Sequence, residues 1–181
     1  APLYVIMVDH GNVDTFYLGA DQVTPAELDG WITELDTELN AEAGQEKKIV
    51  ILGACYSGSF IPDLSGSGRI IVSSAAADEE SFKGPLEPDN IRVGEFFMEE
   101  LFREWGRGSS LHEAFRKATR RTEVFTRKGG GSTNSPNGYF DAAMQHPLLD
   151  DDGDGWGTNT LVDGQGDGQS AKEIFLGTGV T

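Results

Sequence analysis

Three short runs of apolar, largely β-branched residues constrain the fold more strongly than any other feature of the sequence. They lie at residues 3–8 (LYVIMV), 49–52 (IVIL) and 69–74 (RIIVSS). Runs that are apolar at successive positions are typical of strands buried on both faces of a parallel sheet. Helical patterns lie between and after these runs. The order of elements therefore predicts an α/β fold with a mostly parallel sheet flanked by helices.

The first helix has a clear start signal. Thr24 and Glu27 form a capping box, and Pro25 suits the first helical position. We expect the helix to end near residues 43–44. Its apolar residues recur at helical spacing and predict a buried face made of Leu28, Trp31, Ile32, Leu35 and Leu39.

Three more elements are predicted further along the chain. Residues 93–105 place aromatic and leucine side chains on one helical face, and Ser110 with Glu113 opens another helix through a second capping box. His112 falls in the first turn of that helix and is expected at the surface. A short closing strand is predicted at residues 173–176.

The charge of the chain narrows its choice of partners. The sequence has 30 acidic and 14 basic residues, which leaves a formal net charge of -16. Such a surface repels phosphate backbones, so nucleic acid is not an expected partner, whereas basic peptides and divalent cations are compatible with it. No apolar run approaches the roughly 20 residues that cross a bilayer. The sequence predicts no membrane span and no particular compartment.

Two residues with catalytic chemistry directly follow predicted strands. His10 comes after the first run and Cys55 after the second. Parallel strands end at the same edge of a sheet, so the two side chains meet there if the strands are neighbours. A cysteine nucleophile needs a base and backbone donors for an oxyanion, and His10 with the N–H groups of Gly11 and Cys55 would supply them. In the alternative interpretation, Cys55 packs in a tight corner and His10 caps the strand end.

The segments around these two residues resemble a known family. VIMVDHGN at residues 5–12 and ILGACYSGSF at residues 51–60 are similar to the two catalytic motifs of the legumain-like branch of caspase-fold cysteine peptidases, relatives of caspases, clostripain and gingipains. The similarity extends over residues 3–119. It implies a caspase-like three-layer sandwich and a hydrolase that cleaves peptide or protein substrates and needs no cofactor for catalysis.

The resemblance also implies roles for individual residues. His10 and Cys55 would form a catalytic dyad, and Gly11 and Cys55 would supply the oxyanion hole. The strand implied to line the substrate comprises Ser73, Ser74 and Ala75.

The chain departs from the family pattern in two ways. Relatives have strands before the histidine strand, so residues 1–145 are interpreted as a peptidase domain that lacks its first strands. We expect residues 3–8 to have neighbours at both edges, with a second chain, a cleaved fragment or a second copy completing the sheet. Legumains and caspases place Glu or Gln where this chain has Gly53. The family preference at P1, the substrate residue before the scissile bond, therefore does not carry over.

Acidic residues near this position allow two interpretations. Gly53 is expected to leave open space, and the run at residues 78–80 contains Asp78, whose carboxylate could pair with an Arg or Lys side chain at P1. Alternatively, the run is a solvated turn.

The C-terminal residues 146–181 form an acidic, glycine-rich tail. Asp150, Asp152 and Asp154, followed by a glycine, match the opening half of a calcium loop. The glutamate that closes an EF-hand is missing, because Leu161 stands at its position, although Asp163 or Asp167 could substitute for it. Calcium binding and a solvated acidic loop therefore remain alternatives.

Taken together, the motifs predict a cysteine endopeptidase that forms an acyl-enzyme. A peptide ligase on the same dyad is a variant of this prediction. The alternative from another class is a catalytically silent caspase-fold domain that serves as a calcium-dependent scaffold or surface module of a larger protein.

Overall fold

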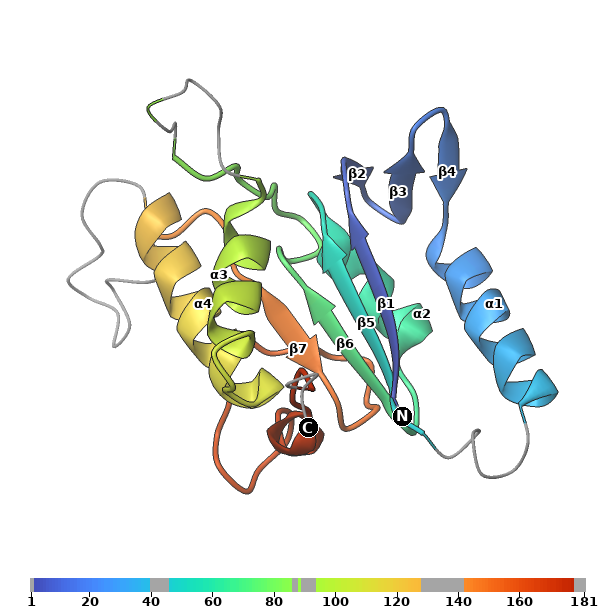
Figure 1. The fold of residues 1–181 in the computed structure, drawn as a ribbon. Helices are drawn as coiled ribbons and strands as arrows, with labels where there is room; N and C mark the ends of the chain where they lie inside the picture. Colours follow the sequence, from blue (N-terminus) through green and yellow to red (C-terminus); the bar gives the residue numbers. More distant parts are fainter. Residues whose placement is uncertain (1, 40–45, 86–87, 89–93, 128–141, 178–181) are drawn as a thin grey trace.

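A four-stranded sheet forms the centre of the fold (Figure 1). The computed structural model describes residues 2–39, 46–85, 88, 94–127 and 142–177. The sheet has the order β1 (Leu3–Val8), β5 (Lys48–Gly53), β6 (Arg69–Ser73) and β7 (Leu148–Asp150). The first three strands are parallel, and β7 pairs with β6 in the antiparallel direction. The predicted mostly parallel sheet is confirmed.

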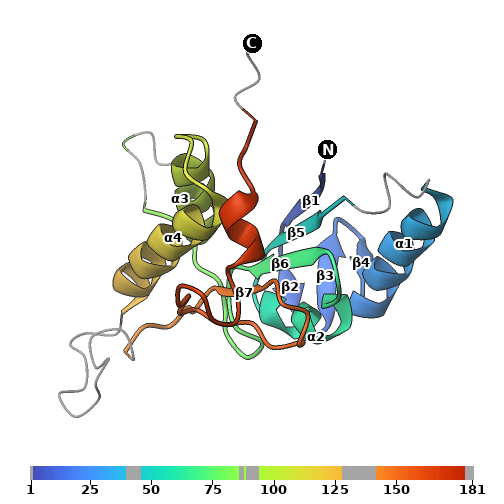
Figure 2. The ribbon, with the colours of Figure 1, turned by 90° about the horizontal axis from the view of Figure 1, so that it is seen from below.

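Helices cover both faces of this sheet (Figure 2). One side carries α1 (Pro25–Glu38) and the short α2 (Ile61–Leu64), and the other carries α3 (Phe96–Trp105) and α4 (Leu111–Thr126). Alternate residues of β5 enter two separate cores. Its isoleucines pack with α3 and α4, while its valine and leucine pack with α1 and α2. The result is the predicted three-layer sandwich.

A small antiparallel sheet follows β1 directly and was not predicted. It contains β2 (Gly11–Asn12), β3 (Thr15–Leu18) and β4 (Asp21–Val23). The sequence suggested a loop here, because the strands are too short to show alternation. Buried Phe16 and Val23 anchor this sheet to the core beneath α1.

The first helix is shorter and less buried than its pattern indicated. It ends at Glu38, before the predicted end at 43–44, which lies outside the described residues. Leu28 and Ile32 are buried, but Trp31 is 53% exposed and Leu35 37% exposed. The reason is that α1 lies at the rim of the sheet, where only a narrow stripe of the helix finds a partner.

The third helix begins later than predicted. It starts at Phe96 rather than 93, because the carboxylate of Glu95 caps it by accepting a hydrogen bond from the backbone N–H of Met98 at 2.7 Å. Position 93 itself lies outside the described residues.

The C-terminal segment packs on the main core instead of closing with a strand. Residues 170–173 form a short 3-10 helix, η3 (Ser170–Glu173), so the predicted strand at 173–176 is wrong. Ile174 joins the α3–α4 core and its carbonyl accepts a hydrogen bond from the N–H of Leu111 at 2.8 Å. The prediction that His112 is exposed is also wrong. Its ring is buried, with Nδ1 2.8 Å from the carbonyl oxygen of Gly168 in this segment.

Strand β1 lies at the edge of the sheet. It pairs only with β5 among the described residues, so that part of the chain does not meet the prediction of neighbours at both edges. Ile6 is 47% exposed and Val8 51% exposed. That a second segment covers this edge stays a prediction. Among the described residues, no helix has the length and apolar character needed to span a membrane.

A cluster of charges joins α3 to α4. Glu100 and Glu104 are buried on α3, and Arg121 of α4 donates to both, at 2.7 and 2.8 Å. Lys117 adds a contact of 3.3 Å to Glu104. Hydrogen bonds from Arg121, with help from Lys117 and despite burial, lower the pKa of Glu104 to about 2.

This cluster predicts how stability depends on pH. The ionised Glu104 stabilises the folded state above its ordinary pKa of 4.5, and this contribution is lost as the pH falls toward about 2. We expect Glu104→Gln to lower the free energy of unfolding at pH 7 by about 1–3 kcal/mol. Urea denaturation at pH 7, 4 and 3 measures this, and the difference from wild type should shrink at pH 3. The control is Glu99→Gln, which affects a half-exposed pair with Arg103. Equal stability of the two variants at pH 7 would contradict the role of Glu104.

Candidate active site

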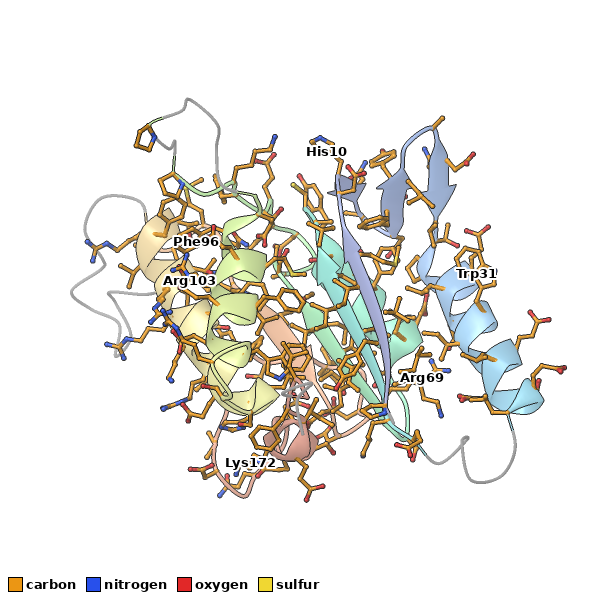
Figure 3. The ribbon with its side chains drawn as sticks, viewed as in Figure 1. His10, Trp31, Arg69, Phe96, Arg103 and Lys172 are labelled. Atoms are coloured by element: carbon orange, nitrogen blue, oxygen red, sulfur yellow. The ribbon has the colours of Figure 1, made fainter. Side chains whose placement is uncertain are left out.

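His10 and Cys55 follow two adjacent strands, at the end of the sheet where the carboxyl ends of the parallel strands lie. Val8 pairs with Gly53 at the end of the β1–β5 register, so each candidate residue lies two positions past a paired residue. The N–H of Asp9 continues the pairing by donating to the carbonyl of Gly53 at 3.2 Å. Figure 3 shows His10 above the end of β1. The two strands are neighbours, which meets the condition that the sequence analysis set for His10 and Cys55 to lie together, while the roles of the two side chains stay a prediction.

The backbone of His10 is held from two sides. Its N–H donates to the Oδ1 atom of Asp9 at 2.7 Å, and its carbonyl accepts from the N–H of Tyr17 in β3 at 3.0 Å. The residue is exposed, and no hydrogen bond joins its imidazole to another described residue. The small sheet therefore fixes the main chain of His10 and leaves the ring accessible from solvent.

The thiol of Cys55 contacts Ser81, a residue that the sequence did not point to. The N–H of Ser81 donates to Sγ at 3.3 Å, and the Ser81 hydroxyl lies 3.7 Å from Sγ. No hydrogen bond between Cys55 and His10 is present in the described part of the chain. Cys55 is half-buried, so the sulfur is partly accessible next to the 78–81 segment.

The turn after Cys55 is tightly held. Tyr56 has a φ of 58°, in the left-handed region, a conformation that costs a bulky residue about 1–3 kcal/mol. Its N–H donates to the carbonyl of Glu79 at 2.7 Å, and that of Gly58 donates to the carbonyl of Ala75 at 2.9 Å. A Cβ at Gly58 would lie 2.7 Å from the backbone of Ala77. These contacts stabilise the turn and with it the position of Cys55.

Gly11 touches the other side of the Cys55 backbone. A Cβ at this position would lie 2.5 Å from the Cys55 carbonyl oxygen and 2.9 Å from the Cβ of Ala54. Side chains do not approach a carbonyl oxygen this closely. Only glycine fits, and the two loops that carry His10 and Cys55 are therefore in direct contact.

The strand predicted to line the substrate has no free hydroxyl groups. Ser73 and Ser74 are buried, and the Ser73 hydroxyl donates to the carbonyl of Ala75 at 3.0 Å. The Ser74 hydroxyl accepts from the N–H of Ala54 at 3.1 Å and lies 3.3 Å from its carbonyl. These side chains hold β6 against the cysteine loop. A peptide beside this strand would therefore have to use backbone groups.

Gly53 does not leave open space, contrary to the expectation from the sequence. A Cβ there would lie 2.5 Å from Cγ of Met98, a buried residue of α3. Met98 therefore fills the volume next to Gly53.

The three residues of the acidic run at 78–80 differ in their contacts and exposure. Glu79 is engaged within the fold, because its carboxylate lies 2.6 Å from Nδ1 of His146 and accepts from the His146 N–H at 2.7 Å. Asp78 and Glu80 are exposed. The part of the run that remains available to a ligand is therefore Asp78 and Glu80.

A further carboxylate lies near this edge and was missed by the sequence analysis. Glu95 accepts a hydrogen bond from Nε2 of Gln145 at 2.7 Å, and the same amide nitrogen lies 2.8 Å from the carbonyl of Ser74. Glu95 also lines a mostly apolar groove of about 590 Å³ with Val8 and Met98. Burial raises the pKa of Glu95 to about 7 despite these hydrogen bonds. No local sequence pattern indicates that Glu95 is buried beside this site, because the residues that surround it come from three distant segments.

The predicted metal residues lie elsewhere. Asp150, Asp152 and Asp154 bring one ligand atom each to within 4.8 Å of one another, after β7. Since β7 runs antiparallel to β6, the loop that follows β7 lies at the opposite end of the sheet from His10 and Cys55. Burial, together with the carboxylates of Asp152 and Asp150, raises the pKa of nearby Asp167 to about 7.

A three-layer sandwich with His and Cys after adjacent parallel strands defines the class of caspase-fold proteins. The crystal structure of caspase-1 from Spodoptera frugiperda matches this chain with a TM-score of 0.56 and 18% sequence identity, over 83% of this chain and 59% of that chain. This chain thus spans less than two thirds of that structure. A comparison with curated protein sequences returned no significant match.

The family follows from the sequence itself. Residues 2–149 match the sequence profile of the Peptidase C13 family, the legumain family. The chain belongs to this family of cysteine-type peptidases, as the two motifs predicted.

The close approach at Gly11 generates a prediction. Gly11→Ala should push the two loops apart and reduce peptide hydrolysis by about 10²-fold, because small displacements of reacting groups are costly. Steady-state kinetics measures the loss, and circular dichroism checks the fold. The matched control is Gly30→Ala in α1, where a Cβ meets nothing within 4 Å. Unchanged hydrolysis in Gly11→Ala would show that the contact has no bearing on catalysis.

Proposed function

We propose that this protein is a cysteine endopeptidase in which Cys55 is the nucleophile and His10 the general base. The observation that carries the proposal is the β1–β5 register, which puts both residues two positions beyond the paired Val8 and Gly53. Membership of the Peptidase C13 family supports it independently.

In the proposed mechanism, His10 takes the proton of the Cys55 thiol and the sulfur attacks the scissile carbonyl carbon. The N–H groups of Gly11 and Cys55 donate to the resulting oxyanion. The intermediate then expels the amine, which receives the proton from His10, and a thioester remains on Cys55. A water molecule, deprotonated by His10, hydrolyses this thioester and releases the acid product.

This mechanism requires the thiol to leave Ser81. Its contacts there are weak because sulfur is a poor hydrogen-bond donor and acceptor, and His10 is exposed with no competing hydrogen bond from its ring to a described residue. Rotation of both side chains is therefore inexpensive. Catalytic hydrogen bonds are often long or absent before substrate binds.

The dyad is tested with single variants and a covalent probe. Cys55→Ala and His10→Ala should each reduce hydrolysis of a peptide substrate by about 10²-fold or more. A peptidyl electrophile should add once to the wild type, detected by intact mass, because Cys55 is the sole cysteine of the sequence. Arg116→Ala, which removes an exposed basic side chain of α4, serves as the control. Near-normal turnover in Cys55→Ala would overturn the proposal and favour a silent scaffold.

We also propose that the peptidase prefers Arg or Lys at P1. Support comes from the acidic groups near the sheet edge, exposed Asp78 and partly buried Glu95, and from the net charge of -16. Arg suits a carboxylate best because its guanidinium binds in bidentate fashion.

A fluorogenic library varied at P1 measures this preference. Asp78→Asn and Glu95→Gln should each lower kcat/KM for Arg substrates by about threefold to tenfold, which corresponds to a partly screened ion pair. Asp63→Asn, an exposed residue of α2, is the matched control and should have no effect. A clear preference for Asp or Asn at P1 would contradict the proposal.

A further inference from the structure

The loop after β7 gathers three carboxylates at one point. One ligand atom each from Asp150, Asp152 and Asp154 lies within 4.8 Å of the others. Like charges at this separation repel one another unless a cation lies between them. No ion pair from a described Lys, Arg or His reaches these three side chains. The cluster is thus uncompensated in a part of the fold that is well away from His10 and Cys55.

Asp150 provides an independent sign that a ligand belongs here. The residue is only 1% exposed. Its Oδ1 accepts a hydrogen bond from the N–H of Gly153 at 3.1 Å, but its Oδ2 is buried with no hydrogen-bond partner. A buried carboxylate oxygen without a partner is costly, and native structures pair such groups with donors or metals. No donor among the described residues supplies the missing partner, whereas a cation shared with the two neighbouring carboxylates would.

The loop is held on the body of the protein. Asp151 points away from the cluster, and its two carboxylate oxygens accept from the N–H groups of Gly168 and Ala171 at 2.7 and 2.8 Å. On the other side, the N–H of Gly155 donates to the hydroxyl of Ser65 at 3.0 Å. Gly155 has a φ of 83°, which permits the sharp turn after the third carboxylate. The three carboxylates are therefore arranged before any ion binds.

We propose that Asp150, Asp152 and Asp154 bind a calcium ion. All three donors are oxygens and no Cys or His belongs to the cluster, which excludes zinc as the preferred ion. Calcium accepts six to eight oxygen ligands at flexible geometry, whereas magnesium demands a near-ideal octahedron. Asp152 and Asp154 are exposed, so water can complete the shell. Counted from Asp150, Trp156 is the seventh residue, and calcium loops of this kind use the backbone carbonyl of that residue as a ligand.

The affinity should be modest. Leu161 stands where calcium loops of the EF-hand type place a bidentate glutamate, so this site lacks two strong ligand oxygens. We expect a dissociation constant of about 10⁻⁴–10⁻³ M, in the range of extracellular calcium modules. The ion would tie the C-terminal segment to the α2 end of the sandwich through the Asp151 and Ser65 contacts. The site therefore acts on stability and does not depend on the proposed peptidase chemistry.

Isothermal titration of the full chain with CaCl₂ and with MgCl₂ tests the proposal. We expect one calcium per chain, weaker magnesium binding, and a rise in Tm with calcium. Asp150→Asn should weaken calcium binding at least tenfold. Asp152→Asn, at an exposed position, should weaken it too and covers the case in which the Asp150 variant fails to fold. Asp163→Asn is the matched control, because that exposed carboxylate pairs with Lys172 outside the cluster.

Terbium luminescence gives a second readout at the same loop. Trp156 is 79% exposed and adjoins the cluster, so it should sensitise emission from a bound Tb³⁺ ion, and CaCl₂ should quench this emission by competition. Trp156→Phe should abolish the sensitised emission and leave calcium binding in the calorimeter unchanged. Absence of binding at about 10 mM CaCl₂, or equal affinity of Asp150→Asn, Asp152→Asn and wild type, would overturn the proposal.

Discussion

The parallel pairing of β1 with β5 is the constraint on which the candidate site depends. Its register ends at Val8 and Gly53, and the loops that follow both strands therefore begin at the same end of the sheet, where the carboxyl ends of the parallel strands lie. Gly11 lies against the carbonyl of Cys55 with no room for a Cβ, so the two loops are joined by direct backbone contact. A shift of the register by one residue would turn every side chain of β1 to the opposite face and separate His10 from Cys55.

The layers around the sheet stabilise this arrangement from both sides. The core under α3 and α4 includes Met98, which fills the space at Gly53, and Ile174 from the C-terminal segment. The core under α1 and α2 includes Phe16. This residue belongs to the small sheet, whose first strand begins immediately after His10. Packing on the two faces is thus coupled to the positions of both candidate catalytic loops. The residues after β7 belong to the same packed unit as the residues before it.

Polar contacts complete the site from distant segments. Gln145 links Ser74 to Glu95. Glu79 links two other segments, because its carboxylate contacts His146 and its backbone carbonyl accepts a hydrogen bond from the N–H of Tyr56. The two partners of each side-chain contact made by Gln145 and His146 lie 50 to 71 residues apart in the sequence. These contacts form only when the end of β6, the start of α3 and the residues before β7 come together in the folded chain. For this reason the sequence analysis overlooked Glu95 and Ser81.

The sequence by itself determined the elements whose signals are local. Continuous apolar runs identified β1, β5 and β6, capping boxes located the starts of α1 and α4, and the two motifs singled out His10 and Cys55. Tertiary structure alone decided which predicted faces are buried, as exposed Trp31 and buried His112 show, and it produced the short strands β2 to β4. It also buried one oxygen of Asp150 without a partner. The physical reason is that periodicity and capping act within a few residues of chain, whereas burial and hydrogen-bond partners depend on segments that meet only when the sheet and its helices have packed.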